Sequence, residues 1–155
     1  MENAVLVSRA LGLTPVRVAL SGAVDRTYES VPASRSCQEF IKRAMELNLE
    51  DVLIQGPLTF DSATSGEIAA LKGIEGPVAG DTDIYLTDTI EECNIVAKAL
   101  INFADTVFSG VIVGARVPVS LVSRTDTLKN KKSSVSIACL VAEYYRLTGV
   151  AGGTI

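Results

Sequence analysis

The sequence predicts an α/β protein, a three-layer α/β/α sandwich around a mixed, mostly parallel sheet. Short aliphatic runs alternate with segments in which apolar residues recur every three or four positions, the patterns of strands and amphipathic helices. Such alternation favours parallel pairing through right-handed crossovers. Of the 155 residues, 48% are hydrophobic but only 5% are aromatic. The core is therefore expected to consist of Val, Ile, Leu and Ala, as in buried parallel strands.

Five elements are expected in the first half of the chain, each defined by its apolar pattern. They are a helix ended by Gly12, a strand at 16–20, a helix capped by Ser34 or Ser36, a strand at 52–54, and a short helix at 67–72. Glycine and proline most often end such elements. We therefore expect Gly56-Pro57 to stop the second strand and Gly73 to close the last helix.

Five more elements are expected in the second half. They are a strand at 84–86, a helix from about 89 with Cys93, Val96, Ala97, Leu100, Ile101 and Ala104 on one face, strands at 111–113 and 117–122, and a helix at 134–147 ended by Gly149. Only a few residues separate the last two strands, whereas a parallel crossover needs a dozen or more. These strands are expected to pair antiparallel or to bend into a separate layer.

The composition excludes several classes of function. With no histidine, the chain contains no Ser-His-Asp or Cys-His catalytic system and no histidine zinc site. The net charge of −4 argues against nucleic acid as a partner, and no apolar stretch is long enough to span a membrane. Three widely spaced cysteines, Cys37, Cys93 and Cys139, are expected to be reduced and buried in a cytoplasmic protein. Asp81 and Asp83 lack a third ligand nearby, so no metal site is expected.

The segment Gly56-Pro57-Leu58-Thr59-Phe60-Asp61 follows a predicted strand. In open α/β sheets, ligands bind beyond the carboxyl ends of the strands. Glycine permits a close approach of the backbone, and proline fixes the turn. Asp61 is expected either to orient a ligand or to cap the next turn, because aspartate favours turns through local hydrogen bonds.

A second candidate site lies in the basic segment that follows the last predicted strand. Ser123 and Arg124 emerge there and are followed by Asp126, Lys129, Lys131 and Lys132. Arginine presents a planar fork of donors that matches a phosphoryl or carboxylate group. In this interpretation Arg124 holds the anion, Ser123 donates to a developing oxyanion, and Asp126 accepts a proton. The alternative is a solvated basic loop, as like-charge runs usually are.

An ordered set of short motifs resembles the phosphate acetyl/butyryltransferase family, and most closely its phosphate butyryltransferase branch. The motifs are Gly56-Pro57-Leu58 with Phe60-Asp61, Lys72-Gly73-Ile74, Gly80-Asp81 with Asp83-Ile84, Asn94-Ile95, Lys98-Ala99-Leu100, Phe103-Ala104, Gly110 with Val113-Gly114-Ala115, Pro118-Val119, and Ser123-Arg124 with Asp126. The resemblance covers nearly the whole chain, from about residue 3 to 142.

The resemblance implies transfer of a short acyl group, butanoyl or similar, between coenzyme A and inorganic phosphate. It implies no cofactor beyond the coenzyme A substrate. Ser123 and Arg124 match the family's pair that binds phosphate and stabilises the transition state, and Gly114 and Lys129 join Gly56, Pro57 and Asp61 as substrate-binding residues. The aspartate that serves as base in the acetyltransferase branch aligns with Asn130, which leaves Asp126 as a weaker substitute.

The resemblance also implies a domain plan similar to that of the isocitrate and isopropylmalate dehydrogenases. Residues 1–116 would correspond to the second domain, residues 117–155 would return to the first, and the family's N-terminal portion has no counterpart here. A homo-oligomer or a missing N-terminal portion is therefore expected as partner. A second hypothesis is a catalytically silent fragment that binds coenzyme A or oligomerises; a dehydrogenase of the same fold ranks last, because no dinucleotide fingerprint is present.

Overall fold

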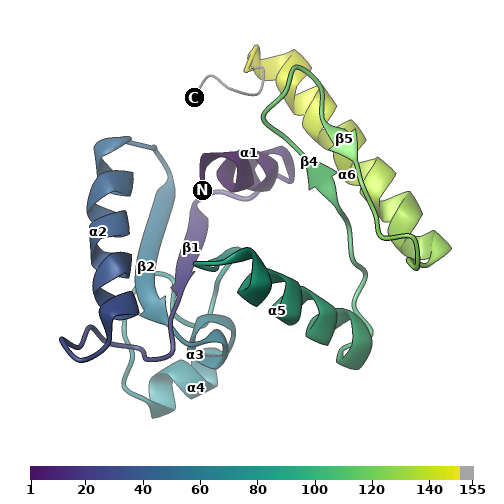
Figure 1. The fold of residues 1–155 in the computed structure, drawn as a ribbon. Helices are drawn as coiled ribbons and strands as arrows, with labels where there is room; N and C mark the ends of the chain where they lie inside the picture. Colours follow the sequence, from purple (N-terminus) through teal and green to yellow (C-terminus); the bar gives the residue numbers. More distant parts are fainter. Residues whose placement is uncertain (151–155) are drawn as a thin grey trace. The chain divides into compact units, whose positions relative to one another are not determined.

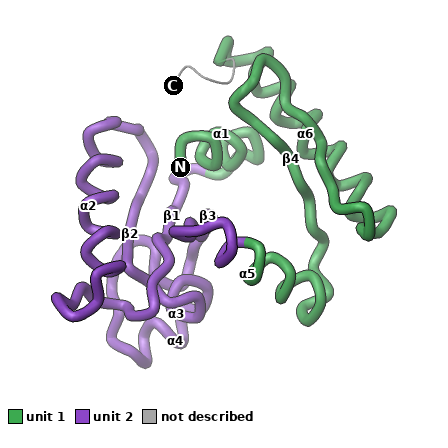
Figure 2. The backbone as a smooth tube through the Cα atoms, in the orientation of Figure 1, with its two compact units in different colours: residues 1–13, 94–155 green, residues 14–93 purple. Residues whose placement is uncertain are grey.

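A computed structural model describes residues 1–150 of the chain. Its contacts divide it into two compact units: unit 1 consists of residues 1–13 and the chain from residue 94 onward, and unit 2 consists of residues 14–93 (Figure 2). Each unit has a core of its own. The expected α/β class with a mostly parallel sheet is confirmed.

Unit 2 is built on a three-stranded parallel sheet in the order β2-β1-β3. The central strand β1 (Val16–Ser21) pairs with β2 (Val52–Leu58) on one side and with β3 (Ile84–Leu86) on the other. Val16, Val18 and Ala19 of β1 are completely buried. This aliphatic strand thus forms the middle of the sheet, as its composition predicts.

Three helices complete unit 2. Figure 1 shows α2 (Pro32–Glu46) running alongside β2, while α3 (Phe60–Thr64) and α4 (Gly66–Leu71) follow directly after it. The Ser65 hydroxyl caps α4 by accepting a hydrogen bond from the Ile68 N–H at 3.3 Å. The main core cluster joins the sheet to these elements and consists of Ala19, Leu58, Ala63 and Val78.

Unit 1 contains α1 (Glu2–Ala10), the part of α5 from residue 94 onward, a short hairpin and the long helix α6 (Leu128–Thr148). The hairpin pairs β4 (Val111–Ile112) with β5 (Val119–Ser120) in antiparallel fashion, as the short connection predicts. Leu6 of α1 packs against Val141 and Tyr145 of α6 in the core of this unit. Gly149 ends α6 in the left-handed conformation, with φ at 71°, which glycine adopts without steric cost.

Three predicted boundaries are wrong. Helix α2 begins at Pro32, and Ser34 lies inside it, where its hydroxyl donates to the Val31 carbonyl at 2.7 Å instead of capping the helix. Strand β2 continues through Gly56-Pro57, because glycine allows β2 to approach Leu20 of β1 where a Cβ would lie 2.6 Å from the Leu20 Cβ. Helix α6 begins at Leu128, after the capping residue Thr127, so the three lysines are helical.

One burial expectation is also wrong. None of the residues of α5 (Ile90–Phe103) is fully buried among the described residues, although Val96, Ala97 and Ile101 of its predicted apolar face are half-buried. Cys37 is buried, but Cys93 and Cys139 are exposed, and all three are free thiols. Periodicity shows which residues share a helix face, but it does not show that another element covers that face.

Candidate functional site

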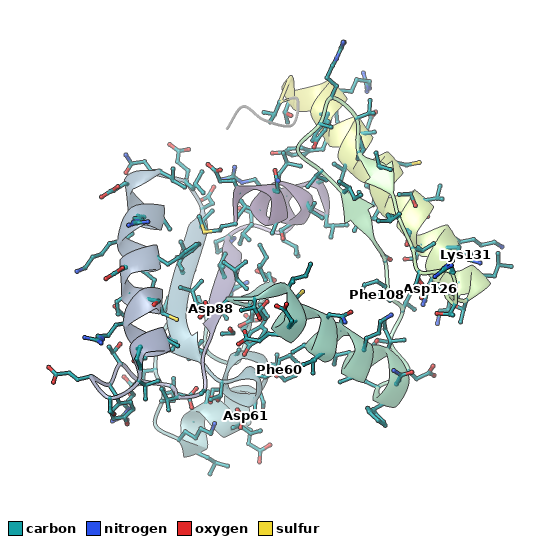
Figure 3. All side chains as sticks on the ribbon, viewed as in Figure 1. Phe60, Asp61, Asp88, Phe108, Asp126 and Lys131 are labelled. Carbon is teal, nitrogen blue, oxygen red and sulfur yellow. The ribbon has the colours of Figure 1, made fainter. Side chains whose placement is uncertain are left out.

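The predicted site residues fall in both units. Gly56, Pro57 and Asp61 belong to unit 2, and Gly114, Ser123, Arg124, Asp126 and Lys129 belong to unit 1. Figure 3 marks Asp61 in one unit and Asp126 in the other. The two groups are described separately.

In unit 1, Ser123, Arg124, Thr125 and Asp126 form a tight turn between β5 and α6. The Asp126 N–H donates to the Ser123 carbonyl at 3.1 Å, and the Ser123 N–H donates to Asp126 Oδ2 at 2.6 Å. Two hydrogen bonds therefore close the turn, one through the main chain and one through the carboxylate. Arg124 and Thr125 occupy the two corner positions, so the Arg124 side chain projects from a fixed backbone and is exposed.

Positive charge accumulates where this turn meets α6. Among residues 1–150, no ion pair involves the four cations of this region, Arg124, Lys129, Lys131 and Lys132. Five ion-pair contacts are found elsewhere, four in unit 2 and one in α6. The N-terminal end of a 21-residue helix adds the partial positive charge of its free N–H groups. Unpaired cations on a fixed turn are suited to bind a phosphoryl or carboxylate group.

Asn130, one turn into α6, connects this turn to a distant segment. Its side chain is 5% exposed; its Nδ2 donates to Asp126 Oδ1 at 3.3 Å, and its Oδ1 accepts the Phe108 N–H at 3.2 Å. Figure 3 shows Phe108 and Asp126 near the start of α6. Asn130 is therefore a satisfied buried amide.

Gly114 lies in unit 1 but in a different part of it, just after β4. Its φ is 100°, and a Cβ there would lie 3.2 Å from the Asn3 side-chain nitrogen of α1. The positive φ and the nearby Asn3 side chain are structural reasons for a glycine at position 114. Within residues 1–150, no hydrogen bond joins Gly114 to the turn at 123–126.

In unit 2, Asp61 belongs to a polar group that we call the Lys72 centre, made of Asp25, Thr59, Asp61, Ser62 and Lys72. The Lys72 ammonium lies 3.2 Å from Asp25 Oδ2 and 2.9 Å from Asp61 Oδ2. It also donates to the hydroxyls of Thr59 at 2.9 Å and Ser62 at 3.0 Å. Asp25 accepts the Thr59 N–H at 2.7 Å, which fixes the backbone where β2 ends and α3 begins.

Hydrogen bonding keeps both carboxylates of the Lys72 centre ionised. The bonds from Thr59 and Lys72 lower the pKa of Asp61 from 3.8 to about 2. Burial raises the pKa of Asp25, but the bonds from Thr59 and Lys72 outweigh it and the net pKa is lowered. The bond to Asp61 and the nearby Asp25 raise the pKa of Lys72. Asp61 is thus an acceptor within a network and a poor base at neutral pH.

An open pocket of about 480 Å³ lies against the Lys72 centre. Its lining is Ala23, Val24, Asp25, Arg26, Tyr28, Thr59, Lys72 and Ile74. Two carboxylates and one ammonium give the Lys72 centre a net charge of −1, but the guanidinium of Arg26 also lines the pocket. The charges of the pocket lining therefore do not exclude an anion in unit 2.

Gly56 and Pro57 have structural explanations in unit 2. Gly56 lies in β2 against Leu20, and its carbonyl accepts the Gln38 side-chain amide of α2 at 2.9 Å. Pro57 contacts the backbone of the chain leaving β1, since a Cβ on Gly22 would lie 2.5 Å from the Pro57 Cβ. Both residues position the end of β2, from which Thr59 and Asp61 follow.

The Lys72 centre as a group was not predicted from the sequence. Lys72 was recognised only as part of a family motif, and Asp25 lies 47 residues away in the sequence. Their meeting depends on the parallel pairing of β1 and β2, which brings the residues after both strands to one edge of the sheet. The only sequence signal for such a group is that both segments follow predicted strands, whose carboxyl ends form ligand sites in parallel sheets.

The parallel sheet of unit 2 and the cationic turn of unit 1 define an α/β protein with a candidate anion site. The chain belongs to the Phosphate acetyl/butaryl transferase family, whose sequence model matches residues 1–139. The resemblance drawn from the motifs is thereby confirmed. No helix within residues 1–150 is both long and apolar enough to cross a membrane.

Individual relatives agree with this assignment. The chain is 36% identical over 145 residues to a probable phosphate butyryltransferase of Bacillus subtilis, covering 94% of this chain and 48% of that protein. It is 34% identical over 151 residues to a phosphate acetyltransferase of Rhizobium meliloti, covering 97% of this chain and 48% of that protein. The fold matches a branched-chain phosphotransacylase from Enterococcus faecalis with a TM-score of 0.78 and 35% identity, over 90% of this chain and 51% of that one. The chain spans about half the length of the relatives it matches.

Proposed function

We propose that this chain provides part of a phosphate acyltransferase, which moves a short acyl group between coenzyme A and inorganic phosphate. The observation that supports this best is the exposed Arg124 guanidinium, which has no ion pair among residues 1–150 and projects from a turn closed by two hydrogen bonds. Family membership supplies the reaction class. Butanoyl or a similar short chain is the proposed acyl group, since both butyryl and acetyl enzymes are among the relatives.

The reaction requires stabilisation of negative charge. A phosphate oxygen attacks the thioester carbonyl carbon, a tetrahedral oxyanion forms, and the C–S bond then breaks to release the coenzyme A thiolate and the acyl phosphate. Arg124 binds the phosphate or the oxyanion through charge-assisted hydrogen bonds. The Ser123 hydroxyl, which lies 3.2 Å from the Thr125 hydroxyl, donates a further hydrogen bond. Asp126, expected from the sequence to accept a proton, is considered in the next subsection.

The remaining predicted site residues are proposed to bind substrate. Lys129, in the first turn of α6, adds positive charge beside Arg124. Gly114 offers its backbone after β4, and Gly56 and Pro57 position the segment that includes Asp61. The coenzyme A thioester is a substrate here, and no other cofactor is proposed.

The proposal extends to the assembly of the whole enzyme. We propose that residues 1–116 correspond to the second domain of a fold like that of the isocitrate and isopropylmalate dehydrogenases, and that residues 117–155 return to the first. The half of the relatives' length that this chain does not span, or a second copy of the chain, is the proposed partner. A cytoplasmic location fits three free cysteines.

The test is phosphate-dependent release of thiol from butanoyl-CoA by the purified chain. Arg124→Ala is expected to lower turnover about 10²- to 10³-fold, the usual loss for one oxyanion donor. Arg43→Ala, an exposed arginine in the last turn of α2, is the matched control and leaves turnover unchanged. If the native chain turns over and the Arg124→Ala variant does so at the same rate, the assignment of Arg124 is contradicted.

A second candidate function is a catalytically silent module that binds coenzyme A or oligomerises. The observation that favours it is the coverage of only about half of each relative. Stoichiometric binding of coenzyme A by the folded chain, with no release of thiol, would support this candidate. Turnover by the chain alone would exclude it.

A further inference from the structure

Both carboxylate oxygens of Asp126 are already bonded within the protein. Oδ2 accepts the Ser123 N–H at 2.6 Å, and Oδ1 accepts the Asn130 amide at 3.3 Å. The first bond closes the turn whose corner is Arg124. A carboxylate whose two oxygens each accept a hydrogen bond from a different protein donor is suited to fix the positions of both donors.

Asn130 extends this bonding away from the turn. Its Oδ1 accepts the Phe108 N–H at 3.2 Å while its Nδ2 donates to Asp126, so the amide must have its oxygen and nitrogen in this orientation. Two more residues of α6 bind the segment that begins at Phe108. The Ser133 hydroxyl lies 2.5 Å from the Ser109 hydroxyl, and the Ser134 hydroxyl accepts the Gly110 N–H at 3.0 Å. One face of α6 thus anchors residues 108–110.

We propose that Asp126 and Asn130 are positioning residues, which hold the turn that presents Ser123 and Arg124 to phosphate, and that Asp126 is not the proton acceptor. This inference rests on the proposed function for its phosphate ligand. The hydrogen-bond relay runs from Phe108 through Asn130 and Asp126 to Ser123, and it ties the turn to the strand segment that enters β4. Both ends of the relay are N–H donors, so the side chains at positions 126 and 130 must each accept one of them, and one of the two must also donate to the other.

Exchanging the two side chains tests this requirement. Asn130→Asp removes the donor and places two carboxylates together, while Asp126→Asn places two amide nitrogens together; each single variant breaks the relay. In the double variant Asp126→Asn/Asn130→Asp, the new amide at position 126 accepts from the Ser123 N–H and donates to the new carboxylate at position 130. That carboxylate in turn accepts the Phe108 N–H. The relay is complete again, and the net charge equals that of the native chain.

The first measurement is the affinity for inorganic phosphate, from titration of the backbone and arginine side-chain NMR signals. Each single variant is expected to bind phosphate about tenfold more weakly, the scale of one hydrogen bond to a charged group, and the double variant to bind within about threefold of the native chain. Asp126→Asn distinguishes the two roles of the carboxylate. Loss of its negative charge alone would strengthen phosphate binding, whereas loss of its hydrogen bonds weakens it.

The second measurement is amide hydrogen exchange at Ser123 and Phe108, which needs no ligand. Both amides are expected to lose protection in the single variants and to regain it in the double variant. Asn102→Asp is the matched control, because within residues 1–150 this exposed α5 amide donates only to the Lys98 carbonyl, at 2.8 Å. It leaves protection and phosphate affinity unchanged.

The outcomes are distinct. Native-like phosphate affinity in both single variants, or a double variant as weak as the singles, would overturn the proposal. If the native chain bound no phosphate, the proposed function of the turn would fail. The exchange of Ser123 and Phe108 would then still decide whether the relay holds the turn.

Discussion

At the scale of single residues, the Lys72 centre determines how unit 2 responds to acid. The pKa of Asp61 is lowered from 3.8 to about 2, so the folded protein binds this proton less tightly than the unfolded chain. The resulting stabilisation is complete above the ordinary pKa and is lost as the pH falls through about 2. The raised pKa of Lys72 gives the opposite trend, with stability lost only when the pH rises through that higher value.

Asp61→Asn should therefore be less stable than the native chain at neutral pH, and the difference should disappear as the pH falls from 3.8 towards 2. Urea unfolding at intervals of pH measures it. Glu67→Gln, an exposed carboxylate in the first turn of α4, is the control and should follow the native curve. A difference that stays constant down to pH 2 would mean that Asp61 acts through packing rather than through its charge.

The sequence predicts residue types at the candidate sites better than it predicts their partners. The segment with Ser123, Arg124 and Lys129 is recognisable because cations cluster there in an acidic chain; the structure puts the first two in the turn before α6 and Lys129 in the first turn of α6. The bonds from Asp126 to Ser123 and Asn130 could not be predicted, because a local turn and the start of α6 were both needed and α6 was expected to begin later. Charge can be read from composition, whereas hydrogen-bond direction requires geometry.

At the scale of elements, α5 exposes large apolar side chains outside the face that its spacing predicts. Ile95 is 68% exposed and Phe103 is 90% exposed, whereas Val96, Ala97 and Ile101 of the predicted face are half-buried. An exposed apolar helix face of this kind marks an association surface or an aggregation hazard. By contrast, Val141 and Tyr145 of α6 are buried. Both helices have apolar residues at helical spacing. They differ in their tertiary contacts, because residues of α6 pack in a core with α1.

Ile95→Glu/Phe103→Glu is expected to change the free energy of unfolding by no more than about 0.5 kcal/mol per site, as exposed substitutions usually do. The same variant should reduce self-association, which sedimentation velocity over a range of concentrations measures. Val18→Glu, which puts a charge at a completely buried position of β1, is the contrasting control and should unfold unit 2. A loss of several kcal/mol in the α5 variant would show that this face is buried in solution.

At the scale of the whole molecule, each of the two units has a small core of its own. Unit 2 is organised around Leu58 and its neighbours, and unit 1 around Val141 with Leu6 and Tyr145. The α/β class and the antiparallel pairing of the last two strands followed from element order and loop length. The division into units did not, because unit 1 joins residues 1–13 to the chain from residue 94 onward, a long-range contact that no local pattern encodes. The family division at 116/117 stays a prediction.

Two cores of this kind should lose stability independently. Leu58→Ala removes a side chain that is 1% exposed and should cost about 2–5 kcal/mol; Val141→Ala, at 0% exposed, should cost about 1–3 kcal/mol. Native-state hydrogen exchange with mass spectrometry resolves the two. Leu58→Ala should lower protection in β1 and β2 but not in α6, and Val141→Ala should do the reverse, because cooperative units open separately. If either variant lowered protection throughout the chain, both cores would belong to one cooperative unit, and the turn at 123–126 would share its stability with the Lys72 centre.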